Sequence, residues 1–202
     1  ESTKLGLASL AENRAWSDDD IHAVHGTLLP HHPHGYRTGQ VWIGGRSVFR
    51  ASYVAPPGEN VPALMTNLLE YANASPDAAI VTAGLLHAQF ETIHPYADGN
   101  GRTGRALIHA VLARAGVVDR GLLPISSVLK GRTDDYIQAL TAFRYEGEDP
   151  AIRRRGFSAY METFLSATID AASLALRMHD TLARIEGRWR QATSAIRSDS
   201  TV

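Results

Sequence analysis

The residues most suited to chemistry lie in one short segment, from His94 to Arg105. Gly99 and Gly101 flank Asn100 there, and glycines permit the positive φ angles that turn successive backbone N–H groups toward one point. A helix is predicted to begin directly afterwards, and the free N–H groups at the start of a helix attract anions. The segment is therefore typical of a phosphate-binding turn.

Two arginines and two further polar side chains extend this prediction. Arg102 and Arg105 are three residues apart and share a face of the first helical turn, where cations are unfavourable unless a polyanion lies beside them. Asp98 is a hard oxygen ligand of the kind that Mg²⁺ accepts together with phosphate oxygens. His94 is suited to general-base catalysis, because the ordinary pKa of histidine, about 6.5, lies near neutral pH. Together these groups indicate a displacement at phosphorus.

Three other kinds of site match the sequence less well. The spacing Gly99-x-Gly101-x-x-Gly104 satisfies the dinucleotide-binding fingerprint, but that fingerprint needs a preceding strand, and the residues before it have a helical pattern. A nucleotide P-loop needs Gly-Lys-Ser/Thr, which the sequence lacks. His87 and Glu91 do not have the His-Glu-x-x-His order of zinc proteases. We expect these two residues to orient the turn or to pack beneath it.

The elements that must position this segment are mostly helices. Residues 78–93 are apolar nearly all round, which indicates a buried central helix, and Pro95 interrupts it. A second helix is expected from about Gly101 to Ala115. Two β-prone runs around Gly44-Gly45 favour a hairpin. The predicted fold class is mostly α with one short β-hairpin. Further helices are expected from Ser17 to Pro30, Glu59 to Ala74, Thr133 to Tyr145 and, as one helix or two, Phe157 to about Ala195.

The composition excludes several classes of protein. The chain has 202 residues, of which 44% are hydrophobic and 20% charged, so it can bury a core. A formal net charge of −1 argues against a basic nucleic-acid coat, and we expect this segment to bind no nucleic acid. The absence of cysteine excludes a disulfide framework and a thiolate nucleophile. Without a long apolar run or a signal sequence, we expect a cytoplasmic protein that binds no membrane, with export into a host cell left open.

Residues 94–105 have the pattern His-Pro-Tyr-x-Asp-Gly-Asn-Gly-Arg-x-x-Arg, which resembles the signature of the Fic (filamentation induced by cyclic AMP) domain family. Segments that also resemble the family are Gly35-Tyr36-Arg37, the Trp42-Ile43-Gly44 hairpin, Tyr53-Val54-x-Pro56-Pro57, the run from His87 to Ile93 and the helix that carries Tyr136. The resemblance implies a Fic-type helical bundle over residues 17–165. We expect a helical lead-in over 1–16, trimmed because the chain begins at Glu1 and not Met, and a C-terminal helical extension over 166–202.

The resemblance implies an enzyme, a protein adenylyltransferase that moves AMP from Mg-ATP to a Ser, Thr or Tyr hydroxyl of a target protein. In such a domain His94 would deprotonate the hydroxyl, and Asp98 would hold Mg²⁺ between the α- and β-phosphates. The nucleotide would be bound by the backbone N–H groups of Gly99, Asn100 and Gly101, by Arg102 at the β-phosphate, by Arg105 at the γ-phosphate and by Tyr136 stacked on adenine. Gly101 favours nucleotidyl transfer, because a lysine stands there in the phosphate-transferring branch of the family.

Two alternatives to AMP transfer stay open at this point. One is another Fic-type reaction, such as transfer of UMP or removal of AMP from a modified target. The other is a regulator that binds ATP without turnover.

The hairpin and Tyr96 carry two further expectations. Trp42, Ile43, Gly44 and Gly45 would form a flap whose strand edge pairs with an extended target segment through main-chain hydrogen bonds. Tyr96 replaces the commoner phenylalanine of the motif, so its ring should pack into the core while its hydroxyl needs a partner.

Regulation is the least defined part of the resemblance. Many relatives carry an inhibitory helix with the pattern Ser/Thr-x-x-x-Glu-Gly/Asn. Neither Glu12-Asn13 nor Glu186-Gly187 has Ser or Thr at the required distance. Three possibilities follow: the inhibitory helix has been trimmed, a separate antitoxin-like inhibitor protein supplies it, or none exists.

Overall fold

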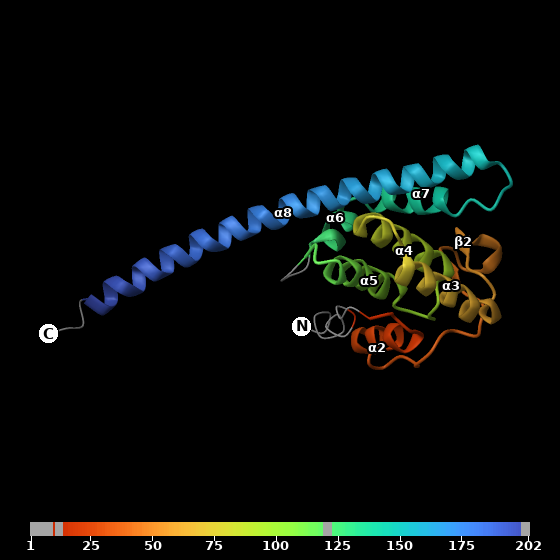
Figure 1. Ribbon diagram of the computed structural model, residues 1–202, viewed down its shortest axis with the longest axis horizontal. Helices are drawn as coiled ribbons and strands as arrows, with labels where there is room; N and C mark the ends of the chain where they lie inside the picture. The colour runs from red at the N-terminus through yellow and green to blue at the C-terminus, as the bar shows by residue number, and fades with distance from the viewer. Residues whose placement is uncertain (1–9, 11–13, 119–122, 199–202) are drawn as a thin grey trace.

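Figure 1 shows the computed structural model, which describes residues 10, 14–118 and 123–198, with side chains up to residue 193. The lead-in expected over residues 1–16 lies mostly outside the described residues. The helices are α2 (Asp18–Leu28), α3 (Val61–Ala74), α4 (Ala79–Ile93), α5 (Asn100–Arg114), α6 (Ile125–Gly131), α7 (Thr133–Phe143) and α8 (Pro150–Ser198). Strands β1 (Trp42–Ile43) and β2 (Tyr53–Val54) form the sheet of this part of the chain. The mostly helical fold with one short hairpin is therefore confirmed.

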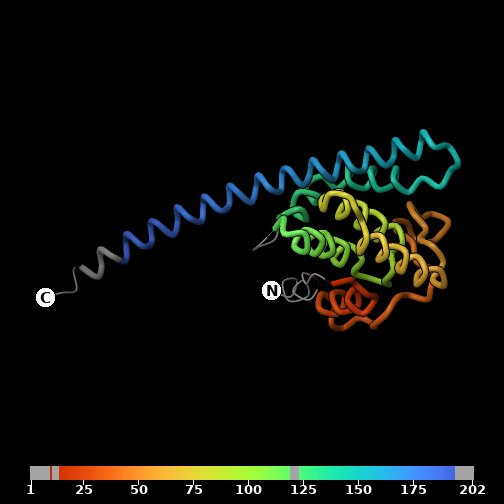
Figure 2. The backbone as a smooth tube through the Cα atoms, in the orientation of Figure 1, coloured from red at the N-terminus to blue at the C-terminus, as the bar shows by residue number. Residues whose placement is uncertain are grey.

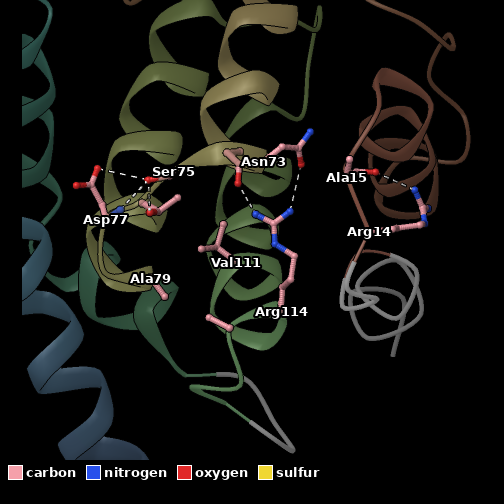
Figure 3. Close-up of a pocket in the computed structure, with 11 residues that line it drawn as sticks. Arg14, Ala15, Asn73, Ser75, Asp77, Ala79, Val111 and Arg114 are labelled. Carbon is pink, nitrogen blue, oxygen red and sulfur yellow. Dashed lines mark hydrogen bonds between the residues drawn. The ribbon is translucent and has the colours of Figure 1, made fainter.

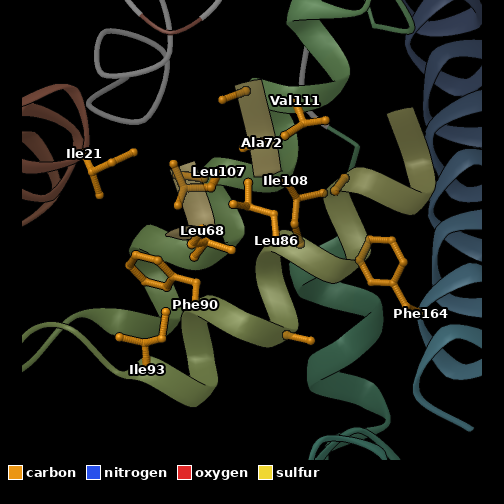
Figure 4. Close-up of a cluster of buried hydrophobic side chains, with 14 of the residues drawn as sticks. Ile21, Leu68, Ala72, Leu86, Phe90, Ile93, Leu107, Ile108, Val111 and Phe164 are labelled. Carbon is orange, nitrogen blue, oxygen red and sulfur yellow. The ribbon is translucent and has the colours of Figure 1, made fainter. Parts of the chain in front are cut away.

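Helices α4 and α5 form the centre of the body, with α3 and α8 packed against α4. Leu86 and Phe90 of α4 share a fully buried core with Leu107 and Ile108 of α5 (Figure 4). Burial of one such side chain contributes about 1.5–3 kcal/mol. The core therefore fixes both helices that flank the segment 94–99, and the turn between them is held at its two ends.

Helix α2 begins where the sequence predicts, with Ser17 as its N-cap. The Ser17 backbone N–H donates to Asp20 Oδ2 over 2.8 Å, which occupies a group that would otherwise lack a partner at the helix start. The helix packs on α3 and α5, with Ile21 and Val24 buried in the core. This packing brings the histidines of α2 to the turn.

The hairpin is less tight than the glycine pair suggests. Trp42 pairs with Val54 and Ile43 with Tyr53, in antiparallel register. The predicted hairpin is therefore confirmed, and the residues between its strands form a long loop with a short 3₁₀ helix over Val48–Arg50. Gly45 has a φ of 69°, and a Cβ there would lie 2.1 Å from the Arg50 carbonyl oxygen. The glycines therefore allow the loop to fold back on itself.

Helix α8 is one continuous helix of 49 residues, and it begins earlier than the predicted start at Phe157. Its first part packs on α4 and α7 through residues such as Tyr160 and Phe164. A Cβ on Gly84 of α4 would lie 2.8 Å from the Phe164 ring, so glycine allows this close approach. The second part extends beyond the body (Figure 2) and exposes large apolar side chains, among them Leu182 and Trp189.

Candidate active site

The turn between α4 and α5 begins at His94, which caps α4 in the left-handed conformation with a φ of 52°. A non-glycine residue in this region is uncommon and costs free energy, so the surrounding structure must stabilise it. The buried Arg37 does so, because its Nε donates to the His94 carbonyl over 2.7 Å and its Nη2 to the Ile93 carbonyl over 3.1 Å. The Arg37 backbone N–H also donates to the Pro95 carbonyl over 2.9 Å.

Arg37 is therefore a positioning residue for the turn, and sequence reasoning missed that role. The sequence marked Gly35-Tyr36-Arg37 only as part of a family resemblance. Its remaining hydrogen bonds reach the carbonyls of Gly39 and Pro56, each over 2.7 Å. A single guanidinium thus ties the segment before the hairpin to the end of α4.

The middle of the turn is closed by Asn100. Its Oδ1 accepts from the Tyr96 backbone N–H over 2.9 Å, and its Nδ2 donates to the Tyr96 carbonyl over 2.8 Å. Because the Asn100 side chain is 2% exposed and used in this way, only its backbone N–H remains for a ligand. Gly99 has a φ of 83°, and its N–H donates to Asp98 Oδ1 over 2.6 Å.

Asp98 and Arg102 lie on the outer side of the turn and pair with each other. Arg102 Nη2 is 3.2 Å from Asp98 Oδ2, with side chains 50% and 59% exposed. His32 Nε2 is 3.7 Å from the same carboxyl oxygen. The structure therefore brings together Asp98 and Arg102, the carboxylate and the first arginine that the sequence predicts. Both side chains are open to solvent.

Arg105 and Tyr136 line one cavity of about 410 Å³, together with Ser126, Ser127, Leu129, Lys130, Thr133 and Ile137. A Cβ on Gly101 would lie 3.0 Å from Arg105 Nη1, so the guanidinium lies against the start of α5. Arg105 makes no hydrogen bond or ion pair with any residue that the structure describes. A cation beside a cavity, next to the start of a helix, is an arrangement that suits an anionic ligand.

A buried polar cluster lies beneath the turn, between α4, α5 and α7. His87 Nε2 and the Tyr136 hydroxyl are 2.8 Å apart, and burial lowers the pKa of His87 to about 4. Burial also raises the pKa of Glu91 to about 7, against the opposing effect of Arg105 and Arg144. The expectation that His87 and Glu91 pack beneath the turn agrees with these contacts.

Gly104 explains how α5 approaches this cluster. A Cβ there would lie 2.9 Å from Glu91 Oε1 and 3.0 Å from His87 Nδ1. Only a residue without a side chain fits such a distance, so the third glycine of the segment serves helix packing. The dinucleotide reading of the three glycines also lacks its strand, because α4 precedes them.

His94 is mostly buried, with 19% of its side chain exposed. Burial lowers the pKa of His94 to about 4, so the imidazole is neutral at pH 7. Its buried Nδ1 makes no hydrogen bond and lies 4.0 Å from Glu91 Oε2. A neutral imidazole with one nitrogen facing the interior has its other nitrogen, Nε2, left to accept a proton.

Tyr96 packs under the turn and confirms both expectations for it. The side chain is 1% exposed, its ring stacks on His25 with centroids 3.7 Å apart, and its hydroxyl is 2.8 Å from His22 Nδ1. His25 Nε2 lies 3.0 Å from the Asp98 carbonyl oxygen. Helix α2 therefore supports the turn from below.

The hairpin lies beside the same turn. The Tyr53 hydroxyl of β2 donates to the Thr92 carbonyl over 2.7 Å, and the Arg144 guanidinium lies 4.1 Å from the centre of the Tyr53 ring. Trp42 of β1 is 40% exposed. Since β1 pairs with β2 alone in the described sheet, its other edge has no strand partner. Trp42 and Ile43 thus lie on an unpaired strand edge, Gly44 and Gly45 follow in the loop, and Tyr53 ties this hairpin to the last turn of α4.

A second cavity, of about 380 Å³, lies at the opposite end of α5 (Figure 3). Arg114 lines it, and its Nη1 donates to Asn73 Oδ1 over 3.2 Å. Its Nη2 donates to the Ala72 carbonyl, and the guanidinium lies 4.2 Å from the centre of the Trp16 ring. The Arg114 guanidinium is therefore occupied by contacts within the protein.

Two other features are absent from the described residues. No cluster of three or more His, Cys, Asp or Glu side chains with metal-binding geometry occurs among them. None of the helices in the described ranges combines the length and the apolar character needed to cross a bilayer.

The comparisons with known proteins agree on one family. The model of the Fic/DOC family matches residues 15–112. A Fic family protein from Desulfovibrio desulfuricans has a TM-score of 0.68 at 26% identity, over 87% of this chain and 52% of that chain. A Fic domain containing signaling protein from Bacteroides thetaiotaomicron shares the fold, with a TM-score of 0.66 at 23% identity over 87% and 69% of the two chains.

Curated relatives match a shorter part of the sequence. A protein of Aquifex aeolicus named as a probable protein adenylyltransferase is 35% identical over 121 residues, which are 59% of this chain and 32% of the relative. The protein adenylyltransferase Fic of Nematostella vectensis is 36% identical over 106 residues, 48% of this chain and 23% of the relative. The chain thus spans a third or less of the length of these relatives. Residues 15–112, just under half of the chain, thus match the Fic/DOC family.

Proposed function

We propose that this chain transfers AMP from ATP to a hydroxyl side chain of a target protein. The observation that carries the proposal is the position of Arg105, which lies against Gly101 at the start of α5 and lines one cavity with Tyr136. That arrangement joins a phosphate-binding turn to a space for the rest of a nucleotide. The names of the curated relatives, protein adenylyltransferases, support the same reaction.

The triphosphate would bind at the turn and the start of α5. The backbone N–H groups of Gly99, Asn100 and Gly101 would donate to phosphate oxygens, with Arg102 at the β-phosphate and Arg105 at the γ-phosphate. The N–H of Gly99 and the guanidinium of Arg102 now pair with Asp98, so nucleotide binding exchanges these internal contacts for contacts with phosphate. Tyr136 would contact the base.

Asp98 would hold the magnesium ion. Its carboxyl group is 59% exposed, and its partners among the described residues are Arg102, His32 and the Gly99 N–H, which leaves oxygen lone pairs for a cation. One carboxylate together with substrate phosphates is an ordinary way to bind Mg²⁺. When bound, the ion would neutralise charge on the phosphates.

His94 would act as the general base through Nε2. The target oxygen forms a bond to the α-phosphorus, the bond from that phosphorus to the bridging oxygen breaks, and pyrophosphate leaves. The hydroxyl proton passes to Nε2, which is available because burial lowers the pKa of His94 to about 4 and keeps the ring neutral. The in-line geometry needed for this step depends on the backbone of His94, which Arg37 holds.

The target would dock along the unpaired edge of β1. Trp42, Ile43, Gly44 and Gly45 would supply main-chain hydrogen bonds to an extended segment, largely without regard to its sequence. Tyr53 ties this hairpin to the last turn of α4, so a docked segment lies near His94. An antitoxin-like inhibitor protein stays a prediction from the resemblance.

Incubation with α-labelled and γ-labelled ATP tests the proposal. We expect label from the α-position alone to remain on protein. Retention of γ-label would show phosphate transfer, and α-labelled UTP used in preference to ATP would show transfer of UMP. Nucleotide binding with no retained label from a range of candidate target proteins would favour the ATP-sensing regulator.

A further inference from the structure

Glu91 is the one carboxyl group in the described residues that is buried beside His94. It is 6% exposed, lies in the last turn of α4, and its Oε1 has no hydrogen-bond partner. Its Oε2 lies 4.0 Å from His94 Nδ1, an atom that is itself buried without a hydrogen bond. Glu91 Oε1 and His94 Nδ1 are thus two buried polar atoms without partners on neighbouring side chains, and burying such atoms is costly, which calls for an explanation.

We propose that Glu91 is a positioning residue for His94: its carboxylate accepts a hydrogen bond from Nδ1–H, so that Nε2 is the nitrogen that takes the proton of the target hydroxyl. This inference rests on the proposed function, in which His94 Nε2 accepts the proton of the target hydroxyl. The gap of 4.0 Å is about 1 Å longer than a hydrogen bond, so the proposal requires the two side chains to approach each other by that amount. Such contacts are often long without substrate and shorten in the reacting complex.

The chemistry gives the carboxylate a defined task. When the target oxygen bonds to the α-phosphorus, the hydroxyl proton moves to Nε2 and the imidazole becomes a cation. A carboxylate at Nδ1 stabilises that cation and selects the tautomer with Nε2 unprotonated. If Glu91 is protonated, it donates to Nδ1 instead, and the ring then carries its proton on Nε2, where it cannot act as base.

The groups around this pair decide when Glu91 is ionised. Burial raises its pKa to about 7, while the cations Arg105 and Arg144 oppose that shift. The titratable and charged groups that act on Glu91 or His94 come from α5, α7, α8 and the loops: Arg105, Tyr136, Tyr160, Arg144, Arg37 and Asp98. The carboxylate form is therefore reached near neutral pH, in the range where the enzyme would operate.

A rival acceptor for Nδ1–H exists in the Glu91 backbone carbonyl, which raises the pKa of His94. That oxygen already accepts a hydrogen bond from Arg144 Nη2 over 2.9 Å. A side-chain substitution at position 91 leaves the carbonyl in place. The two acceptors are thus separable by mutation.

The test combines Glu91→Gln, which keeps the shape and removes the charge, with Glu70→Gln on the exposed face of α3 as the matched control. Ring nitrogens labelled with ¹⁵N are followed by NMR from pH 5 to 9 without nucleotide, and His94→Ala identifies the His94 signals. In the wild type, the Nδ1-protonated tautomer of His94 should increase as pH rises through about 7, in step with Glu91 ionisation. In Glu91→Gln this change should disappear, while Glu70→Gln behaves as the wild type.

Kinetics give the second readout. Glu91→Gln should lower kcat on the order of tenfold or more with KM for ATP unchanged, and the rise of kcat with pH near 7 should vanish. Identical His94 nitrogen shifts in Glu91→Gln and the wild type would overturn the inference, whatever happens to kcat. Because the NMR measurement needs no transfer reaction, a tautomer change without any AMP transfer would retain the Glu91–His94 coupling and reject the proposed function instead.

Discussion

The two ends of α5 each have an arginine beside a cavity, but the protein uses the two arginines differently. At the C-terminal end, Arg114 donates to Asn73 and Ala72 and lies over the Trp16 ring. At the N-terminal end, Arg105 has no hydrogen bond or ion pair with the described residues. A guanidinium with its donors used holds the fold together, whereas one with free donors beside a cavity is ready for a ligand.

Buried side-chain atoms without a hydrogen-bond partner occur near the start of α5. Glu91 Oε1, His94 Nδ1 and Thr103 Oγ1 are examples, and His109 Nδ1 is another, farther along the helix. The residues around Arg114 form a closed set, because Asn73 also accepts from the Trp16 backbone N–H over 2.8 Å and donates to the Trp16 carbonyl over 2.9 Å. Cavity volume alone does not separate the two ends, since the cavities are about 380 and 410 Å³. What separates the two ends is whether their polar groups already have partners within the protein.

The largest expected effect is on chemistry at the N-terminal end. His94→Ala should reduce AMP transfer by about 10²- to 10⁴-fold, because a general base contributes about that much. Affinity for ATP should stay within about twofold of the wild type, since the base acts only in the chemical step. Labelled AMP on protein and equilibrium binding of ATP provide the two measurements. Undiminished labelling would remove His94 from the reaction.

Replacing the arginine at each end of α5 with alanine tests the comparison directly. Arg105→Ala should weaken ATP binding by roughly ten- to a hundredfold with little change in unfolding free energy, because charge-assisted hydrogen bonds contribute about 1.5–3 kcal/mol. Arg114→Ala should do the reverse, with about 1–3 kcal/mol lost from the free energy of unfolding and ATP affinity unchanged. Calorimetric titration and denaturant unfolding measure the two effects. Equal effects of both variants on ATP binding would contradict the division.

Stability against pH should reveal the buried carboxyl at the N-terminal end. Burial raises the pKa of Glu91 from 4.5 to about 7, so its contribution to stability is present below pH 4.5 and is lost as pH rises through 7. Burial lowers the pKa of His87 from 6.5 to about 4, so its contribution is lost as pH falls through that range. Relative to the wild type, Glu91→Gln should gain on the order of 1–3 kcal/mol between pH 4.5 and 8. A pH-independent difference in unfolding free energy would refute this.

The smallest expected effect concerns Tyr96. Tyr96→Phe removes the hydroxyl that lies 2.8 Å from His22 Nδ1 and keeps the ring stacked on His25. The free energy of unfolding should fall by about 1 kcal/mol, and AMP transfer should change by less than about threefold. Thermal unfolding and the labelling assay check both values. A loss of transfer comparable to that of His94→Ala would give the hydroxyl a role in the site that the account lacks.

The sequence alone predicted which segment forms the site, but not which distant residues pack around it. The turn between two helices follows from local signals, because Pro95 ends one helix and Gly99 and Gly101 permit the turn before the next. The clustering of Arg37, Tyr136 and Arg144 around it depends on residues far apart in the chain. No periodicity or capping signal carries that information, which is set by tertiary packing.

The fold shows a similar limit. The buried character of α4 was predictable, since apolar residues occur on all its sides. The loop between β1 and β2 was not, because Gly44-Gly45 is an ordinary hairpin turn signal and the fold-back onto Arg50 is a tertiary contact. The short helix α6 has too few residues for a periodic pattern and escaped prediction. Helix α8 was predicted as one helix or two, and its single span depends on the absence of proline after Pro150.

A crystal structure with a non-hydrolysable ATP analogue and Mg²⁺ tests the central claim most directly. The account predicts phosphate oxygens at the N–H groups of Gly99 to Gly101, with Arg105 turned onto the terminal phosphate and Asp98 on the metal. Electron density for the nucleotide at the Arg114 cavity, with the turn still closed by the Asp98–Arg102 pair, would contradict it.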